Sequence, residues 1–111
     1  MLHSTNVIVR KAPGDEAAVL GLRAAWAVMS SGGLDTQLVY MGDGVFNLLK
    51  LPGYMGSLLD RFVSEGGVVS ALGESLEQRG LSGDDLIEGV TVVDRDDIAD
   101  LVQESDATIT F

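Results

Sequence analysis

The stretch Leu38-Val39-Tyr40-Met41-Gly42-Asp43-Gly44-Val45-Phe46 decides the fold, because a buried apolar run breaks into a tight polar turn and then resumes. Its first four residues are continuously apolar, which is typical of a strand covered on both faces in a parallel sheet. The glycines allow backbone angles that side chains forbid, and Asp43 can bond the amides of its own turn or cap a following helix. Ligands of open α/β sheets bind at the carboxyl ends of strands, so this turn is the first candidate for a functional site.

Length and hydropathy indicate one domain with more apolar surface than its own core buries. The 111 residues suit a single domain over residues 1–111. Their 46% hydrophobic content and mean hydropathy of +0.25 exceed what a monomer of this size needs. We expect part of this surface to face another subunit. The sequence has no run of roughly eighteen apolar residues and no basic-then-apolar leader before Asn6, which predicts a cytoplasmic protein.

Charge and cysteine content exclude several classes of function. The 17 acidic and 7 basic residues give a formal net charge of -10, which repels phosphate backbones and anionic membranes, and we find no local basic patch. We therefore expect no binding to nucleic acid or membrane. The chain has no cysteine, which excludes a disulfide, a zinc-thiolate site, an iron-sulfur cluster and a thiol nucleophile. The sequence indicates no metal and no cofactor.

Apolar runs that alternate with helical segments predict a single-domain, three-layer α/β/α fold with a five-stranded parallel sheet. The strands are expected at residues 6–10, 36–41, 68–72, 90–93 and 107–111. Helices are expected at residues 15–30, 46–51, 57–63, 74–78 and 95–102, and a loop with an apolar tip at residues 53–56. Ser57, Ser82 and Asp94 are predicted N-caps, the last in a capping box with Asp97. Periodicity does not supply the strand order.

The helix predicted at residues 15–30 has almost no polar face, because Arg23 is its only charge after Glu16. A helix that is apolar all round must be covered all round, and one sheet covers only one face. We therefore expect a neighbouring subunit on the opposite face, with Leu22, Trp26 and Met29 as interface candidates. The alternative is that an alanine-rich helix tolerates exposure.

Known catalytic and phosphate-binding motifs are absent. A dinucleotide fingerprint fails because the glycines follow the second strand and the third glycine of the pattern falls on Asn47. A P-loop fails because no Gly-Lys-Ser/Thr ending is present. A Ser-His-Asp triad would need His3, the only histidine, which lies in the terminal arm. The cluster Asp94, Asp96 and Asp97 suits the first turn of a helix better than a Mg²⁺ or Ca²⁺ site.

Four segments carry a resemblance to a known family. They are Met41-Gly42-Asp43-Gly44-Val45 after the second strand, Leu76-Glu77-Gln78-Arg79-Gly80 after the third, Gly89-Val90 at the fourth and residues 106–111 at the end of the chain. Together, in this order and spacing, they resemble the DsrE/DsrF-like family of small sulfur-relay proteins. The resemblance implies a flavodoxin-like or Rossmann-like fold, assembly as trimers or hexamers of identical or related subunits, and sulfur carried as a cysteine persulfide in the active subunits.

The chain departs from this family at the site itself. In sulfur-carrying members a cysteine follows the third strand, and counting back from Arg79-Gly80 places it at about Leu72, with an occasional second cysteine near Ser75. Neither residue holds a persulfide, because a serine hydroxyl does not replace a thiolate at neutral pH. The resemblance therefore implies a non-catalytic, cysteine-free subunit that oligomerises and acts as a scaffold or partner in intracellular sulfur relay.

The alternative function is a small-ligand-binding homo-oligomer that uses the loops at the carboxyl ends of the strands, with Phe111 beside them, as a pocket. The candidate ligand-binding residues are Gly42, Asp43, Gly44, Leu72, Gly73 and Ser75. A hydrolytic or transfer enzyme ranks lower, because no nucleophile and base can be paired in the sequence. Without cysteine, we expect no persulfide sulfurtransferase activity from this chain alone.

Overall fold

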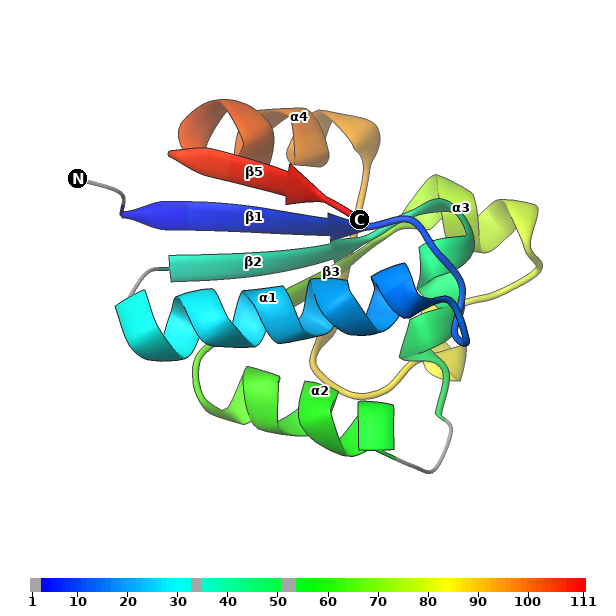
Figure 1. Ribbon diagram of the computed structural model, residues 1–111. Coiled ribbons are helices and arrows are strands. Elements are labelled where there is room, and N and C mark those ends of the chain that lie inside the picture. The colour runs from blue at the N-terminus through cyan, green and yellow to red at the C-terminus, as the bar shows by residue number, and fades with distance from the viewer. Residues whose placement is uncertain (1–2, 33–34, 51–53) are drawn as a thin grey trace.

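The computed structural model describes residues 3–32, 35–50 and 54–111, which form a fully parallel five-stranded sheet (Figure 1). Its strand order is β4-β3-β2-β1-β5. The strands are β1 (Ser4–Val9), β2 (Asp35–Tyr40), β3 (Val68–Leu72), β4 (Val90–Val93) and β5 (Ala107–Thr110). The prediction of five parallel strands is confirmed, and β3 and β4 have the predicted bounds.

Helices cover both faces of this sheet. They are α1 (Glu16–Gly32), the 3₁₀ segment η1 (Gly42–Leu48), α2 (Tyr54–Ser64), α3 (Gly73–Gln78), the 3₁₀ turn η2 (Gly83–Asp85) and α4 (Arg95–Glu104). From β1 to β4 the chain steps across the sheet in one direction, and right-handed crossovers place α1 and α2 on the same face. The connection from β4 to β5 returns across the sheet, so α4 lies on the opposite face (Figure 1). The three-layer α/β/α prediction is confirmed.

The core lies between the central strands and α1. Alternate residues of β1, β2 and β3 are fully buried on this face: Val7, Val9, Leu38, Tyr40, Val69 and Ala71. From α1, the side chains of Ala18, Leu22 and Ala25 complete the cluster. Gly21 lets the helix approach closely, because a Cβ at this position would lie 2.6 Å from a methyl group of Val9.

The apolar surface of α1 is covered mainly within the subunit. Leu22 has an exposed fraction of 0%, so its prediction as an interface residue is wrong: the sheet covers it. Trp26 is half-buried against α2, where its indole nitrogen donates to the carbonyl oxygen of Leu58 at 3.2 Å and its ring contacts Phe62 edge-on. One stripe of α1 stays exposed, and its only large apolar side chain is Leu20, at 48%.

Two local predictions were wrong around η1 and α2. The loop predicted at residues 53–56 is instead the start of α2 from Tyr54 onward, so Ser57 lies inside the helix rather than at its N-cap. Leu59 and Phe62 are fully buried and anchor α2 in the core. The short helix predicted at residues 46–51 is the 3₁₀ segment η1, whose Val45 and Leu48 are buried at i, i+3 spacing. Residues 51–53 lie outside the described part of the chain.

The caps of the second half agree with the sequence. The Asp94 carboxylate accepts from the amide of Asp97 at 2.8 Å, and the Asp97 carboxylate accepts from the amide of Asp94 at 3.0 Å, a complete capping box. Val102 of α4 is exposed, and α4 is bonded to the sheet at the carbonyl oxygen of Leu101, which accepts from the side-chain amide of Asn6 of β1 at 2.7 Å. Within the described ranges, no helix is long and apolar enough to cross a membrane.

Candidate functional site

The carboxyl ends of all five strands open onto one edge of the sheet, because the strands are parallel. The loop after β1, η1 after β2 and α3 after β3 gather at this edge, beside the chain end that follows β5 (Figure 1). His3 precedes β1 and therefore lies at the opposite edge. The geometry thus places the only histidine far from the candidate residues and excludes a Ser-His pair.

Two glycines of the central turn meet backbone constraints. Gly42 has φ of +56°, in the left-handed region that favours glycine. Gly44 packs directly against the end of β1, where a Cβ would collide with the carbonyl oxygen of Val9. The close packing is sufficient to explain why residue 44 is a glycine. The polar groups of the turn that can make contacts are then the Asp43 carboxylate and the Gly42 amide.

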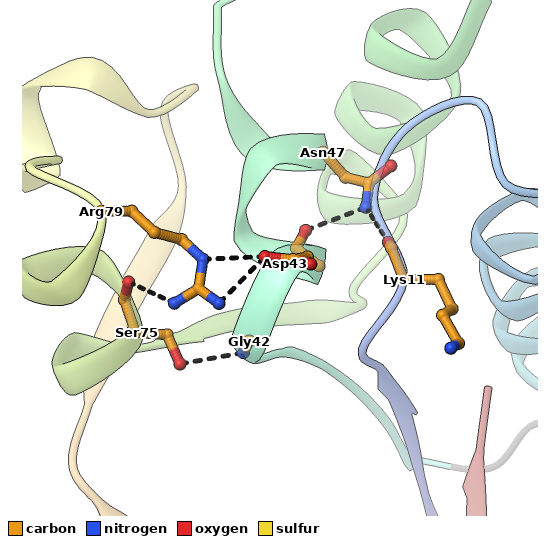
Figure 2. A network of polar contacts seen from close by, with 7 residues as sticks. Lys11, Gly42, Asp43, Asn47, Ser75 and Arg79 are labelled. Carbon is orange, nitrogen blue, oxygen red and sulfur yellow. Dashed lines mark hydrogen bonds and ion pairs between the residues drawn. The ribbon is translucent and has the colours of Figure 1, made fainter.

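Asp43 forms an ion pair across the site. Its carboxylate accepts hydrogen bonds from Nε and Nη2 of Arg79 at 3.1 and 2.9 Å, with the Arg79 side chain 22% exposed and Asp43 64% exposed (Figure 2). Arg79 also donates from Nη1 to the carbonyl oxygen of Ser75 at 3.0 Å. Of the two roles expected for Asp43, the helix cap is wrong, because the N-cap of η1 is Met41 and the Asp43 carboxylate accepts from Arg79 at the end of α3.

Ser75 links η1 to α3. Its side chain is buried, at 5% exposed, and its hydroxyl oxygen accepts from the amide of Gly42 at 2.9 Å (Figure 2). Within η1, Asn47 donates to the carbonyl oxygens of Lys11 and Gly44, both at 2.9 Å, and connects η1 to the loop after β1. The structure therefore joins Gly42, Asp43 and Ser75 into one network with Arg79.

Leu72 and Gly73 border a separate groove between α3 and α4. Leu72 ends β3 and is only 5% exposed, and Gly73 begins α3 against Val92 of β4. The groove has a volume of about 740 Å³, and its remaining lining is Glu74, Glu77, Val92, Val93, Asp94, Arg95, Asp96 and Asp97. The candidate residues therefore fall into two neighbouring sets. Gly42, Asp43 and Ser75 belong to the polar network, and Leu72 and Gly73 border the acidic groove.

Local structure accounts for most carboxylates of the groove. Glu74 forms an ion pair with Arg95 at 2.6 Å, and Asp94 and Asp97 bond backbone amides in the capping box of α4. Among the described residues, no three acidic or histidine side chains are arranged to hold a metal ion. Asp94 and Asp97 thus act as capping groups of α4, the structural role that the sequence predicts for them.

Tyr40, directly before the central turn, turns its side chain away from the site. It is fully buried in the core, and this burial raises the pKa of its hydroxyl well above the usual value. The hydroxyl has no hydrogen-bond partner in the described structure. A neutral, enclosed phenol supplies no base or nucleophile to the carboxyl edge.

Arg79 is the site residue that sequence reasoning missed. In the sequence it stands only as part of the segment after the third strand, and its bond to the Ser75 carbonyl is typical of a cation at the end of a helix. Its ion pair with Asp43 joins residues 36 positions apart. The available signal was positional, because both residues follow the ends of neighbouring strands and must meet at the same edge.

Comparison with known proteins identifies similar chains over the full length. The sequence profile of the DsrE/DsrF-like family matches residues 3–111. The uncharacterized protein MK0008 of Methanopyrus kandleri is 35% identical, covering 96% of this chain and 92% of its own length. The uncharacterized protein MJ0989 of Methanocaldococcus jannaschii is 33% identical, covering 96% and 97% respectively.

Two solved structures share the fold over the whole of both chains. The crystal structure of the ychN protein from E. coli matches with a TM-score of 0.88 at 26% identity, covering 100% of each chain. The protein of unknown function MTH1491 from Methanobacterium thermoautotrophicum matches with a TM-score of 0.82 at 24% identity, again over 100% of each chain. The second likeness concerns the fold alone.

Proposed function

Because this chain belongs to the DsrE/DsrF-like family, we propose that it is a non-catalytic subunit that oligomerises and acts as a scaffold or partner in intracellular sulfur relay. The observation that carries the proposal is a family match over residues 3–111 in a chain without cysteine. The fold is retained in full, whereas the thiol that sulfur transfer requires is missing. A retained fold without the reactive group supports a role in assembly.

The two residues at the positions that the resemblance assigns to sulfur, Leu72 and Ser75, are buried and contact other parts of the subunit. Leu72 is nearly enclosed at the end of β3, and the Ser75 hydroxyl is bonded to the amide of Gly42. Arg79, the nearest cation of the network, is bonded to Asp43. These contacts favour a structural use of the former site, because its polar groups already satisfy one another.

The proposed contact with other subunits involves the exposed part of α1. Trp26 and Met29 keep part of their surface exposed, and Leu20 presents the largest exposed apolar side chain of the helix. Leu22 contributes nothing to this surface. The partner is a second copy of this chain or a related DsrE/DsrF-like subunit, in a trimer or hexamer.

The test uses the purified chain alone and mixed with a cysteine-bearing DsrE/DsrF-like protein. Size exclusion with light scattering is expected to give a closed trimer or hexamer in one of the two samples. Leu20→Asp should weaken this assembly, and Val102→Asp on α4, across the sheet, should not. A monodisperse monomer in both samples at micromolar concentration would contradict the proposal.

Sulfur chemistry is checked in the same mixture. After the cysteine-bearing protein is loaded with persulfide, mass spectrometry is expected to find the added sulfur on that protein and none on this chain, because no thiolate is present to accept it. Sulfur recovered covalently on this chain would overturn the non-catalytic assignment.

The groove of about 740 Å³ beside Leu72 and Gly73 favours a second candidate, a homo-oligomer that binds a small ligand. Native mass spectrometry distinguishes the two. A stoichiometric small molecule retained by the homo-oligomer, released by Gly73→Trp, would support ligand binding over the scaffold role.

A further inference from the structure

The strand order creates a topological switch point between β1 and β5. From β1 the chain proceeds through β2, β3 and β4 in one direction, and β5 is then added on the other side of β1. Crevices at the carboxyl ends of the strands beside such a reversal are where open α/β sheets bind ligands. The groove beside Leu72 lies at β3 and β4, on the opposite side of the sheet from β5, and is therefore a different site.

A pocket of about 360 Å³ lies at this switch point, lined by Arg10, Lys11, Thr110 and Phe111. Its backbone is fixed from two sides. The amide of Arg10 donates to the carbonyl oxygen of Phe111 at 2.9 Å, and the amide of Phe111 donates to that of Ile8 at 2.7 Å. Asn47 holds the carbonyl oxygen of Lys11 at 2.9 Å. The backbone of the pocket is thus held in place, whereas the side chains of Arg10, Lys11 and Thr110 are exposed.

The two cations of the pocket have no partner of opposite charge in the described structure. Arg79 is paired with Asp43 and Arg95 with Glu74, whereas no carboxylate side chain of the described residues forms an ion pair with Arg10 or Lys11. Lys11 extends away from the network that holds its backbone (Figure 2). In a chain with a formal charge of -10, two adjacent unpaired cations at the switch point are an unusual local excess of positive charge.

We propose that this pocket binds a small oxyanion, or the oxyanion group of a larger ligand. Arg10 offers a planar fork of donors, Lys11 a mobile point charge and Thr110 a hydroxyl. Phe111, half-buried with its ring against Gly21, forms an apolar wall beside them. Negative charges of the protein more than about 8 Å from the pocket are screened at physiological salt and weaken binding only partly. The proposal is independent of the oligomeric role.

The test follows amide resonances of the full chain while sodium phosphate, sulfate or acetate is added, with sodium chloride at matched ionic strength as reference. We expect saturable shifts concentrated at residues 10, 11, 110 and 111 with at least one oxyanion and not with chloride. The tightest of the three identifies the head group. Arg10→Gln/Lys11→Gln should raise the Kd by about tenfold or more, because charged hydrogen bonds are lost.

A matched control is Lys50→Gln, which removes an exposed cation from a different surface and should change the Kd by less than about twofold. The double variant changes only side chains, and the bonds that hold the pocket use the backbone atoms of residues 10, 11 and 111. We therefore expect it to fold, and an unchanged circular dichroism spectrum checks this. Equal shifts with chloride, shifts spread over all surface cations, or a Kd unaffected by Arg10→Gln/Lys11→Gln would overturn the proposal.

Discussion

Asp43 and Arg79 lie 36 positions apart in the sequence, and yet two hydrogen bonds of 2.9 and 3.1 Å join them at the carboxyl edge. The pair connects η1 to α3, and the bond from the Gly42 amide to the Ser75 hydroxyl oxygen adds a third link. Because Asp43 is 64% exposed, solvent screens the pair and its contribution to stability is modest. The main effect of these bonds is to fix the relative position of two short helical segments.

A double-mutant cycle measures this link. Asp43→Ala and Arg79→Ala are each expected to lower the free energy of unfolding by about 1 kcal/mol, with a coupling energy of about 0.5–1 kcal/mol between them. Urea denaturation provides the measurement. Asp84→Ala is the control, since this exposed carboxylate has no ion-pair partner in the described residues and should change stability by less than about 0.5 kcal/mol. Additive effects of the two substitutions would show that the ion pair contributes nothing.

Gly44 offers a second test at the same scale. Gly44→Ala places a Cβ against the backbone of Val9, which cannot move without disturbing β1, so we expect a loss of about 3 kcal/mol or more. Gly83→Ala is the matched change in the other 3₁₀ segment. There the nearest atom would be 3.9 Å away, and stability should change by less than about 1 kcal/mol. Similar denaturation midpoints for the two variants would refute the close approach of η1 to β1.

Among the elements, α1 and α2 show how a helix without a polar face is accommodated in one subunit. The sheet buries one side of α1, and α2 covers the flank that carries Trp26. The guanidinium of Arg61, also on α2, lies 5.4 Å from the centre of the Trp26 ring. What remains for solvent or a partner is the narrow stripe around Leu20.

Two substitutions on α1 separate packing from assembly. Trp26→Asp removes the contacts with α2 and buries a charge, so we expect the subunit to lose about 3 kcal/mol of stability. Leu20→Asp lies on the exposed stripe and should cost less than about 1 kcal/mol while weakening association. Circular dichroism during urea denaturation, together with light scattering, reads out both effects. A stable subunit with Trp26→Asp would show that α2 does not depend on this contact.

The start of β5 is tied to the start of β1 by Asp106. Its carboxylate accepts from the amides of His3 at 2.6 Å and Ser4 at 3.1 Å, and these bonds hold its pKa below the usual 3.8. A lowered pKa in the folded state means that the stabilisation is present above the unfolded pKa and is lost as the pH falls through the folded one. Asp106→Asn should therefore lower the urea midpoint at pH 7, with the difference from the unchanged chain disappearing on acidification.

The carboxyl carbon of Asp106 provides a direct measurement of this titration. In the folded protein its resonance should titrate below pH 3.8, with the amides of His3 and Ser4 shifting along the same curve. A midpoint at or above the usual aspartate value would contradict the bonded geometry.

At the scale of the whole molecule, the formal charge of -10 dominates behaviour in solution. Only two ion pairs are formed among the described residues, so most carboxylates repel one another across the surface. Raising sodium chloride from about 0.02 to 0.5 M shortens the screening length several-fold and should raise the urea midpoint.

A charge-altered variant is the control for this salt effect. Asp84→Lys/Glu88→Lys adds two charges at each position, changing the formal charge from -10 to -6, and should reduce the response to salt. A midpoint that salt leaves unchanged in the original chain would show that self-repulsion is unimportant for stability.

The sequence by itself determined those features that depend on near neighbours along the chain. Alternation of apolar strands with helices specified a parallel α/β sheet, and β3 was located residue for residue. The capping box of Asp94 and Asp97 joins residues three positions apart, so its pattern is legible without a structure. The rule that parallel strands share a carboxyl edge brought Gly42, Asp43 and Ser75 correctly to one place.

Tertiary structure alone decided what depends on strand order and on contacts between distant segments. The position of β5 beside β1 creates the switch point, and no local period encodes it. The helix α2 begins at Tyr54, inside a predicted loop, and Phe62 anchors it in the core. The ion pair of Asp43 with Arg79 likewise needs the register between neighbouring strands, because hydrogen bonding selects partners by distance in space and not by separation along the chain.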